Sequence, residues 1–172
     1  MNSFFELAKE RYSVRAYLPK PVEDEKLQKV LEAGLLAPTA KNQQPQKIYV
    51  VKSEELKAKL AAVTPCTFNA PVVLVICYDE ERACKGKVYE NYSFGNTDAA
   101  IVGTHMMLEA ADLGLGTCWV GWFCEKEVKE ALGLPENIRV CDLMPIGYTA
   151  PDAHISQMHY NSRELKDTVE YI

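Results

Sequence analysis

The hydrophobic positions of the chain follow two different periods. After Pro21, apolar side chains recur with the i, i+3, i+4, i+7, i+8 spacing of one helix face, at Leu27, Val30, Leu31, Gly34 and Leu35. Pro38 ends this predicted helix, because proline cannot continue it. The run Val72–Tyr78 is instead apolar at every position, which predicts a strand buried on both faces at the centre of a sheet.

Further helices and strands are predicted on both sides of this strand. The other helices span Asn2–Arg11, Glu54–Leu60 with Ser53 as N-cap, Thr97–Leu113 and Glu125–Leu132. The β-type runs are Ile48–Val51, Gly114–Trp122 and Val140–Ile146. No repeat or change of composition divides the sequence, so we expect one domain over residues 1–172. Residues 149–172 have little periodicity, and we expect this C-terminal extension to need a partner surface.

Composition and charge exclude several classes of function. The 172 residues are 48% hydrophobic, which suffices for one core, and the net charge of -5 argues against a nucleic-acid-binding surface. No apolar stretch approaches the length of a membrane span and no leader is visible, so we expect a cytoplasmic protein without membrane contact. The six cysteines form no paired motif and the three histidines are scattered, so we expect reduced, mostly buried thiols and no structural metal.

Three segments carry candidate binding chemistry, and the first is Arg11-Tyr12-Ser13-Val14-Arg15. On a helix end, two arginines four residues apart project from the same face and can close on one anion, to which the Ser13 hydroxyl adds a donor. This combination suits a phosphate. The alternative is that both arginines are solvated or paired with carboxylates such as Glu6 and Glu10.

The second segment is the polar, amide-rich stretch from Ala37 to Gln46. Asn42 and Gln44 each carry a donor and an acceptor on one planar amide, the chemistry that reads the polar edge of an isoalloxazine ring. Pro38, Thr39 and Ala40 offer a small, flat contact for the apolar side of such a ring. A plain polar turn bounded by prolines is the alternative.

The third segment runs from Gly114 to Trp122. Its glycines permit close approach of the backbone to a flat ligand, and a backbone N–H can be aimed at flavin N5 and O4. For Trp119 and Trp122, packing is favoured over direct contact with a ring. The polar stretch from Asp79 to Asn96 is long for a plain connection, and a lid and an ordinary loop both stay open for it. It carries three aromatic candidates for ligand contacts, namely Tyr89, Tyr92 and Phe94.

In their order and content these motifs resemble the FMN-dependent nitroreductase family. The resemblance covers essentially the whole chain and also includes Asn69-Ala70-Pro71, Leu113–Gly121 and Pro145-Ile146-Gly147-Tyr148. It implies an α+β fold, a three-layer α-β-α sandwich with a mixed, mainly antiparallel central sheet, that forms an intertwined homodimer with two FMN molecules at the interface. Two positions depart from the family pattern: Ser162-Arg163 stands where a basic pair is expected, and Gln46 replaces the more common Trp.

The resemblance also implies roles for individual residues. Arg11 and Ser13 would hold the phosphate with the backbone of Tyr12 alongside, and Arg15 would lie near flavin N1 and the C2 carbonyl. Arg163 would serve in place of the family's basic pair at the phosphate, which would leave that site one positive charge weaker. The other subunit would contribute four residues of the Ala37–Gln46 segment, with Gln44 close by. These four are Pro38, Thr39, Ala40 and Asn42. The N5/O4 edge would be lined by Cys118, Trp119, Val120 and Gly121.

The expected activity is that of an NAD(P)H-dependent FMN oxidoreductase. NAD(P)H would reduce the flavin at N5 and leave, and a flat electron-poor acceptor such as a nitroaromatic or quinone would take the electrons at the same face, which is ping-pong turnover. No side chain is expected to act as an obligatory acid or base, because positioning and electrostatics around the flavin carry the chemistry. Two alternatives are a flavin-binding storage or sensing protein with little turnover and a flavin-free interaction domain.

Overall fold

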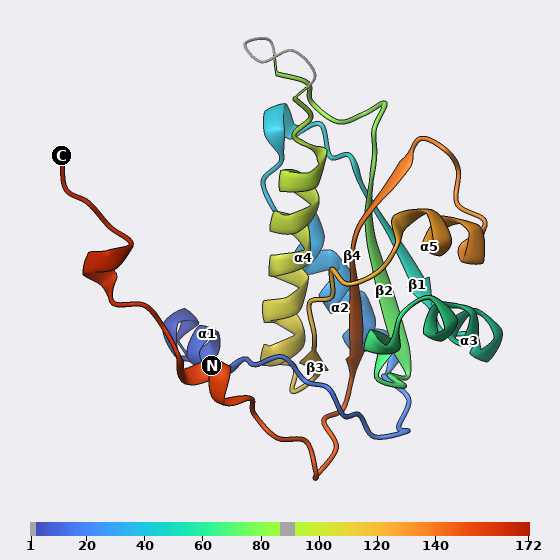
Figure 1. Cartoon of the computed structure of the whole chain (residues 1–172), viewed down its shortest axis with the longest axis horizontal. Helices are drawn as coiled ribbons and strands as arrows, with labels where there is room; N and C mark the ends of the chain where they lie inside the picture. Colours follow the sequence, from blue (N-terminus) through green and yellow to red (C-terminus); the bar gives the residue numbers. More distant parts are fainter. Residues whose placement is uncertain (1–2, 87–91) are drawn as a thin grey trace.

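The computed structural model of the protein describes residues 3–86 and 92–172, and it is built around a four-stranded sheet (Figure 1). The strands are β1 (Gln46–Val51), β2 (Val72–Asp79), β3 (Gly116–Thr117) and β4 (Ile138–Gly147), in the spatial order β1-β2-β4-β3. Every pair of neighbouring strands is antiparallel. β2 lies between β1 and β4 and is buried from Val72 to Tyr78, which confirms the predicted central strand.

The helices lie close to their predicted positions. They are α1 (Phe4–Glu10), α2 (Asp24–Leu35), α3 (Glu54–Val63), α4 (Gly95–Asp112) and α5 (Glu125–Leu132), with short 3-10 turns η1 (Ala40–Asn42), η2 (Pro65–Thr67), η3 (Gln157–Tyr160) and η4 (Leu165–Asp167). Ser53 accepts a hydrogen bond from the Leu56 N–H, as expected of an N-cap. One core prediction is wrong, because Leu35 is 67% exposed. Gly34 faces Met106 of α4, so the next residue along α2 projects away from that contact.

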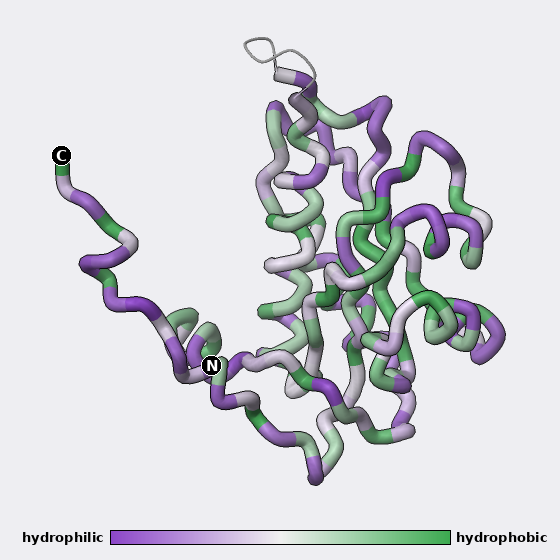
Figure 2. Tube along the Cα trace, viewed as in Figure 1, coloured by the Kyte–Doolittle hydropathy of each residue, from purple (hydrophilic) through white to green (hydrophobic). Residues whose placement is uncertain are grey.

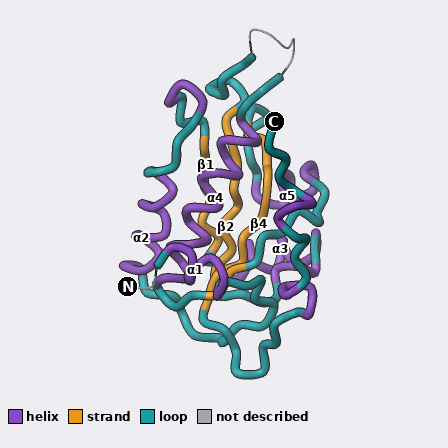
Figure 3. Tube along the Cα trace, turned by 90° about the vertical axis from the view of Figure 1, so that its left-hand side faces the viewer, coloured by secondary structure: helices purple, strands orange, loops and turns teal. Residues whose placement is uncertain are grey.

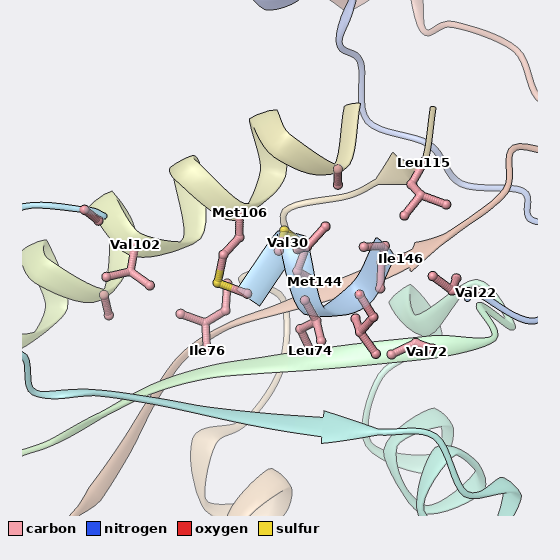
Figure 4. Packing of buried hydrophobic residues seen from close by; sticks show 14 of the residues in the cluster. Val22, Val30, Val72, Leu74, Ile76, Val102, Met106, Leu115, Met144 and Ile146 are labelled. Carbon is pink, nitrogen blue, oxygen red and sulfur yellow. The ribbon is translucent and has the colours of Figure 1, made fainter. Parts of the chain in front are cut away.

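Helices cover both faces of the sheet (Figure 3). On one face, α2 and α4 pack against β2 and β4 in a cluster whose centre includes Val30, Leu74, Met106 and Met144 (Figure 4). On the other face, α3 and α5 contribute Leu60 and Val128 to a second cluster with Val75 and Leu143. Successive residues of β2 alternate between the two clusters, and the strand is therefore apolar at every position.

The segment after α1 runs extended along the edge of the sheet beside β3. Ser13 forms a parallel bridge with Thr117, the Val14 N–H donates to the Thr117 carbonyl at 2.9 Å, and Tyr17 bridges Thr149 in antiparallel fashion. Gly116 makes this approach possible, because a Cβ there would lie 2.6 Å from Val14 Cγ2 and 2.7 Å from Thr149 Oγ1. Within the described residues, the parallel pairing of the predicted mixed sheet is limited to this one bridge.

The C-terminal extension leaves the sheet, passes α1 and then projects away from the rest of the fold (Figure 1). Figure 2 shows that green, hydrophobic segments recur along it, although it is not folded into the core. Its large exposed apolar side chains are Met158, Tyr160, Leu165, Val169, Tyr171 and Ile172. Among the described residues, no helix is long and apolar enough to span a bilayer.

Candidate functional site

The Arg11–Arg15 segment has a different conformation from the one predicted. Arg11 is the C-cap of α1 with φ -63° and ψ 130°, and the chain beyond it is extended rather than helical. In an extended chain residues i, i+2 and i+4 share a face, so Arg11, Ser13 and Arg15 still project together, while Val14 between them is buried. The helical spacing was therefore wrong, although the shared face that it implied is present. Pairing with Thr117 imposes the extended form.

Cys118 lies directly beside this segment. Its thiol is buried, and burial raises the pKa of Cys118, whereas the neighbouring Arg15 guanidinium and Ser13 hydroxyl act to lower that pKa. The Tyr17 hydroxyl donates to the carbonyls of Val14 at 2.9 Å and Pro145 at 3.2 Å, which fastens the segment to β4. The structure thus brings the predicted phosphate residues and the start of the predicted N5 edge together.

The rest of the predicted N5 edge runs from Trp119 to Gly121, and Trp122 follows it. Trp119 packs on α4, where a Cβ at Gly103 would lie 2.7 Å from its ring, as the packing interpretation predicts. Trp122 differs, since 77% of it is exposed. Val120 exchanges backbone hydrogen bonds with Leu143, and the exposed Gly121 lies near the Asp142 carboxylate.

Asp142 is a half-buried carboxyl that sequence reasoning missed. Burial raises the pKa of Asp142 to about 6, and a hydrogen bond with Trp119 opposes that rise. It belongs to β4, where an acid among apolar residues was the available signal.

The loop from Pro38 to Gln44 has an unusual backbone. Lys41, Asn42 and Gln44 have φ angles of 52°, 55° and 49°, in the left-handed region that residues other than glycine seldom adopt. The Gln44 N–H donates to Thr39 Oγ1 at 3.1 Å, and the Gln44 amide donates to Asn42 Oδ1 at 3.1 Å. The side chains of Asn42 and Gln44 are exposed, so both amides are available to a ligand at the surface.

Asp98 of α4 holds this loop and was also missed from the sequence. Its Oδ1 accepts a hydrogen bond from the Ala40 N–H at 2.9 Å, and the residue is only 2% exposed. An acid within the small and apolar run of α4 was the signal that could have found it.

The structure does not bring the loop and the arginines together within one chain (Figure 1). The loop contacts α4 at Asp98, whereas Arg11 and Tyr12 line a cleft with Ala111 at the other end of the helix. Asp98 and Ala111 are thirteen residues apart, which corresponds to about 20 Å along the helix axis. That cleft has a volume of about 150 Å³, below the roughly 300 Å³ of a typical cofactor pocket.

The remaining predicted contacts lie elsewhere. Arg163 is exposed in the C-terminal extension and donates to the Asp167 carbonyl at 2.6 Å. Upstream of it, the His159 ring contacts the Tyr12 ring edge to face with centroids 6.4 Å apart. Tyr92 and Phe94 form a similar pair at 4.8 Å, and Tyr89 lies outside the described residues. The 79–96 segment, for which a lid and an ordinary loop were both expected, lies only partly within the described residues.

Comparison with known proteins places this site in a family. A sequence profile of the nitroreductase family matches residues 8–66 and 64–148. The chain belongs to the nitroreductase family. This confirms the resemblance drawn from the motifs. The matched residues include all three candidate segments, namely residues 11–15, 37–46 and 114–122.

Relatives within the nitroreductase family carry informative names. A crystal structure of a nitroreductase family protein from Clostridium difficile 630 is 35% identical, with a TM-score of 0.91 over 99% of this chain and 98% of its own. An FMN-dependent nitroreductase from Clostridium difficile R20291 is 28% identical, with a TM-score of 0.77 over 98% of each chain. The Bacillus subtilis (strain 168) protein named FMN reductase (NAD(P)H) is 30% identical over 167 residues, covering 87% of this chain and 67% of its own. These names agree with the predicted cofactor and enzyme class.

Proposed function

We propose that this nitroreductase family member is an NAD(P)H-dependent FMN oxidoreductase that reduces flat electron-poor acceptors such as nitroaromatics or quinones by a ping-pong mechanism. The observation that carries the proposal is the shared face of Arg11, Ser13 and Arg15 beside Cys118. The Arg11 guanidinium and the Ser13 hydroxyl suit a phosphate monoester, and the Arg15 guanidinium on the same face supplies a second cation for the flavin ring. The names of the relatives support FMN as the phosphate-bearing ligand.

The chain's residues fit FMN in two separate groups. Arg11 and Ser13 would hold the phosphate with Tyr12 alongside, and Arg163 of the extension would add a further cation. Arg15 would keep a fixed positive charge beside the N1 side of the ring, where it favours the reduced, more negative state. The residues that would line the N5/O4 edge are Cys118, Trp119, Val120 and Gly121.

The second group would come from another copy of the chain. Pro38, Thr39, Ala40 and Asn42, with Gln44 close by, would contact the ring. Because the two groups lie at opposite ends of α4, one copy cannot enclose the ligand, whereas two copies can. We therefore include an intertwined homodimer of three-layer α-β-α sandwiches in the proposal, with residues 149–172 packed on the partner through their exposed apolar side chains.

The chemistry is divided between cofactor and protein. When bound, FMN would supply the redox chemistry, with its N5 as the hydride-accepting position toward NAD(P)H and as the source of electrons for the acceptor. The protein binds and orients both ligands on the same face of the ring, and none of its side chains is required as an acid or base. The six free thiols suit a reducing compartment, which supports a cytoplasmic location.

Removal of the arginines tests this assignment. Each charge-assisted hydrogen bond contributes about 1.5–3 kcal/mol, so Arg11→Ala/Arg15→Ala should weaken FMN binding by at least about a hundredfold and yield nearly colourless protein. Lys59→Ala/Lys126→Ala is the charge-matched control, because both lysines are exposed, on α3 and α5, and belong to neither of the proposed residue groups. A double arginine variant that keeps its full yellow colour would refute the phosphate assignment.

Turnover separates an enzyme from a flavin-binding protein. NAD(P)H oxidation is measured with menadione and with a nitroaromatic, and the proposed enzyme oxidises more than one equivalent of donor per FMN only when such an acceptor is supplied. A storage or sensing protein would stay at background with both acceptors. Sedimentation of FMN-loaded protein tests the dimer, since a stable monomer of 19.3 kDa that retains FMN would contradict the shared site.

A further inference from the structure

Asp98 is the acidic residue among the buried polar side chains of the described chain. Its Oδ1 accepts the Ala40 N–H at 2.9 Å, and its Oδ2 is buried without a hydrogen-bond partner among the described residues. Burial of a carboxylate is unfavourable unless it is well paired, and one hydrogen bond from a neutral donor does not offset the free-energy cost of burying an acid here. A residue of this kind suggests a role beyond packing.

The contact that Asp98 makes is with a loop under conformational strain. Left-handed φ angles at Lys41, Asn42 and Gln44 persist only when surrounding structure holds them in place. Within the loop, the contacts of Gln44 with Thr39 and Asn42 maintain its shape. The Ala40–Asp98 hydrogen bond fixes that shape relative to the rest of the fold.

The anchor is rigid because α4 is packed along its length. The turns after Asp98 contribute Val102 and Met106 to the core, with Met106 completely buried. Gly103 of the same helix supports the Trp119 ring. α4 therefore contacts the loop through Asp98 in its first turn and the Trp119 ring through Gly103 near its middle.

We propose that Asp98 is a positioning residue for the flavin ring. It fixes the Ala40 N–H, and through this amide it sets the direction of the Asn42 and Gln44 side chains toward the ring. The inference rests on the proposed function, because it requires FMN at this loop. Asp98 itself does not contact the cofactor.

Two substitutions at Asp98 separate geometry from charge. Asp98→Asn keeps an oxygen that can accept from Ala40 and replaces the other oxygen by an amino group, whereas Asp98→Ala removes the acceptor. Ala40→Pro removes the donor and leaves α4 untouched. Proline is compatible with this position, because Thr39 before it is extended with φ -130° and ψ 154° and Ala40 begins a 3-10 turn.

The test measures the dissociation constant of FMN by quenching of flavin fluorescence, together with the visible circular dichroism of the bound ring. Asp98→Ala and Ala40→Pro should each weaken binding by about tenfold, as expected for one lost hydrogen bond, and the double variant should be no weaker. Asp98→Asn should restore both affinity and the dichroism spectrum. The matched control is Thr97→Ala, at an exposed position in the same helical turn.

The outcomes are distinct. If Asp98→Ala or Ala40→Pro binds FMN with wild-type affinity, the positioning role alone is overturned. An Asp98→Asn variant that binds FMN as weakly as Asp98→Ala would overturn it as well. If Asp98→Ala does not fold, an Ala40→Pro variant that binds FMN with wild-type affinity overturns the positioning role. Wild-type protein that takes up no FMN would overturn the proposed function, and the positioning role with it.

Discussion

Gly116 fixes the arginine segment against the sheet, and its replacement by alanine has a calculable effect. A Cβ at this position would lie 2.6 Å from Val14 Cγ2 and 2.7 Å from Thr149 Oγ1. Val14 is 2% exposed and cannot rotate into solvent, so the backbone around it must move. Such overpacking costs about 1–3 kcal/mol, which for a domain of this size lowers Tm by roughly 3–10 °C.

The same displacement reaches the proposed phosphate site. Val14 lies between Ser13 and Arg15, so Gly116→Ala should weaken FMN binding as well as lower Tm. Thermal unfolding by circular dichroism at one protein concentration and FMN titration measure the two effects. Gly121→Ala is the control for stability, because its Cβ would meet Asp142 Oδ1 at an ordinary 3.7 Å. An unchanged Tm and an unchanged FMN affinity for Gly116→Ala would refute the close approach of the two segments.

Two further predictions concern titrating groups. Because burial raises the pKa of Asp142 from 3.8 to about 6, the stability that its protonated form confers is present below 3.8 and lost as pH rises through 6. Asp142→Asn should therefore flatten the fall in stability between these values, by roughly 1 kcal/mol after allowance for solvent screening, and parallel Tm profiles of the two proteins would contradict this. The Tyr148 hydroxyl donates to Glu23 Oε2 at 2.7 Å and is the main reason why the pKa of Glu23 is lowered to about 2. Tyr148→Phe should return that pKa toward 4.5 in an NMR titration, and a pKa that stays near 2 would exclude this cause.

The elements with strong hydrophobic periodicity could be predicted from the sequence. α5 begins and ends where the pattern places it, and β2 is central because its residues serve two cores in alternation. Leu35 shows the limit of this reasoning, since periodicity identifies an apolar face but not where the neighbouring helix stops covering it. That depends on how α2 crosses α4.

The residue types of the candidate site could be predicted from the sequence more readily than their arrangement in space. Residues four apart, such as Arg11 and Arg15, share a side in a helix and in an extended chain alike. The segment is extended because Ser13 pairs with Thr117, which is distant in sequence. Asp98 was not identified, because its hydrogen bond is with one backbone amide of a loop that contacts α4 only after folding. Non-local contacts of this type leave little trace in local patterns.

The separation of the two residue groups at opposite ends of α4 has a genetic consequence. Suppose that each site takes its arginines from one copy and its loop from the other. A copy defective only in its arginines and a copy defective only in its loop are then inactive alone, but they complement each other when mixed. Random pairing makes half of the dimers hybrids, and each hybrid carries one intact and one doubly defective site, so about a quarter of wild-type activity returns. Two null alleles of this kind would then support growth together under conditions where neither does alone.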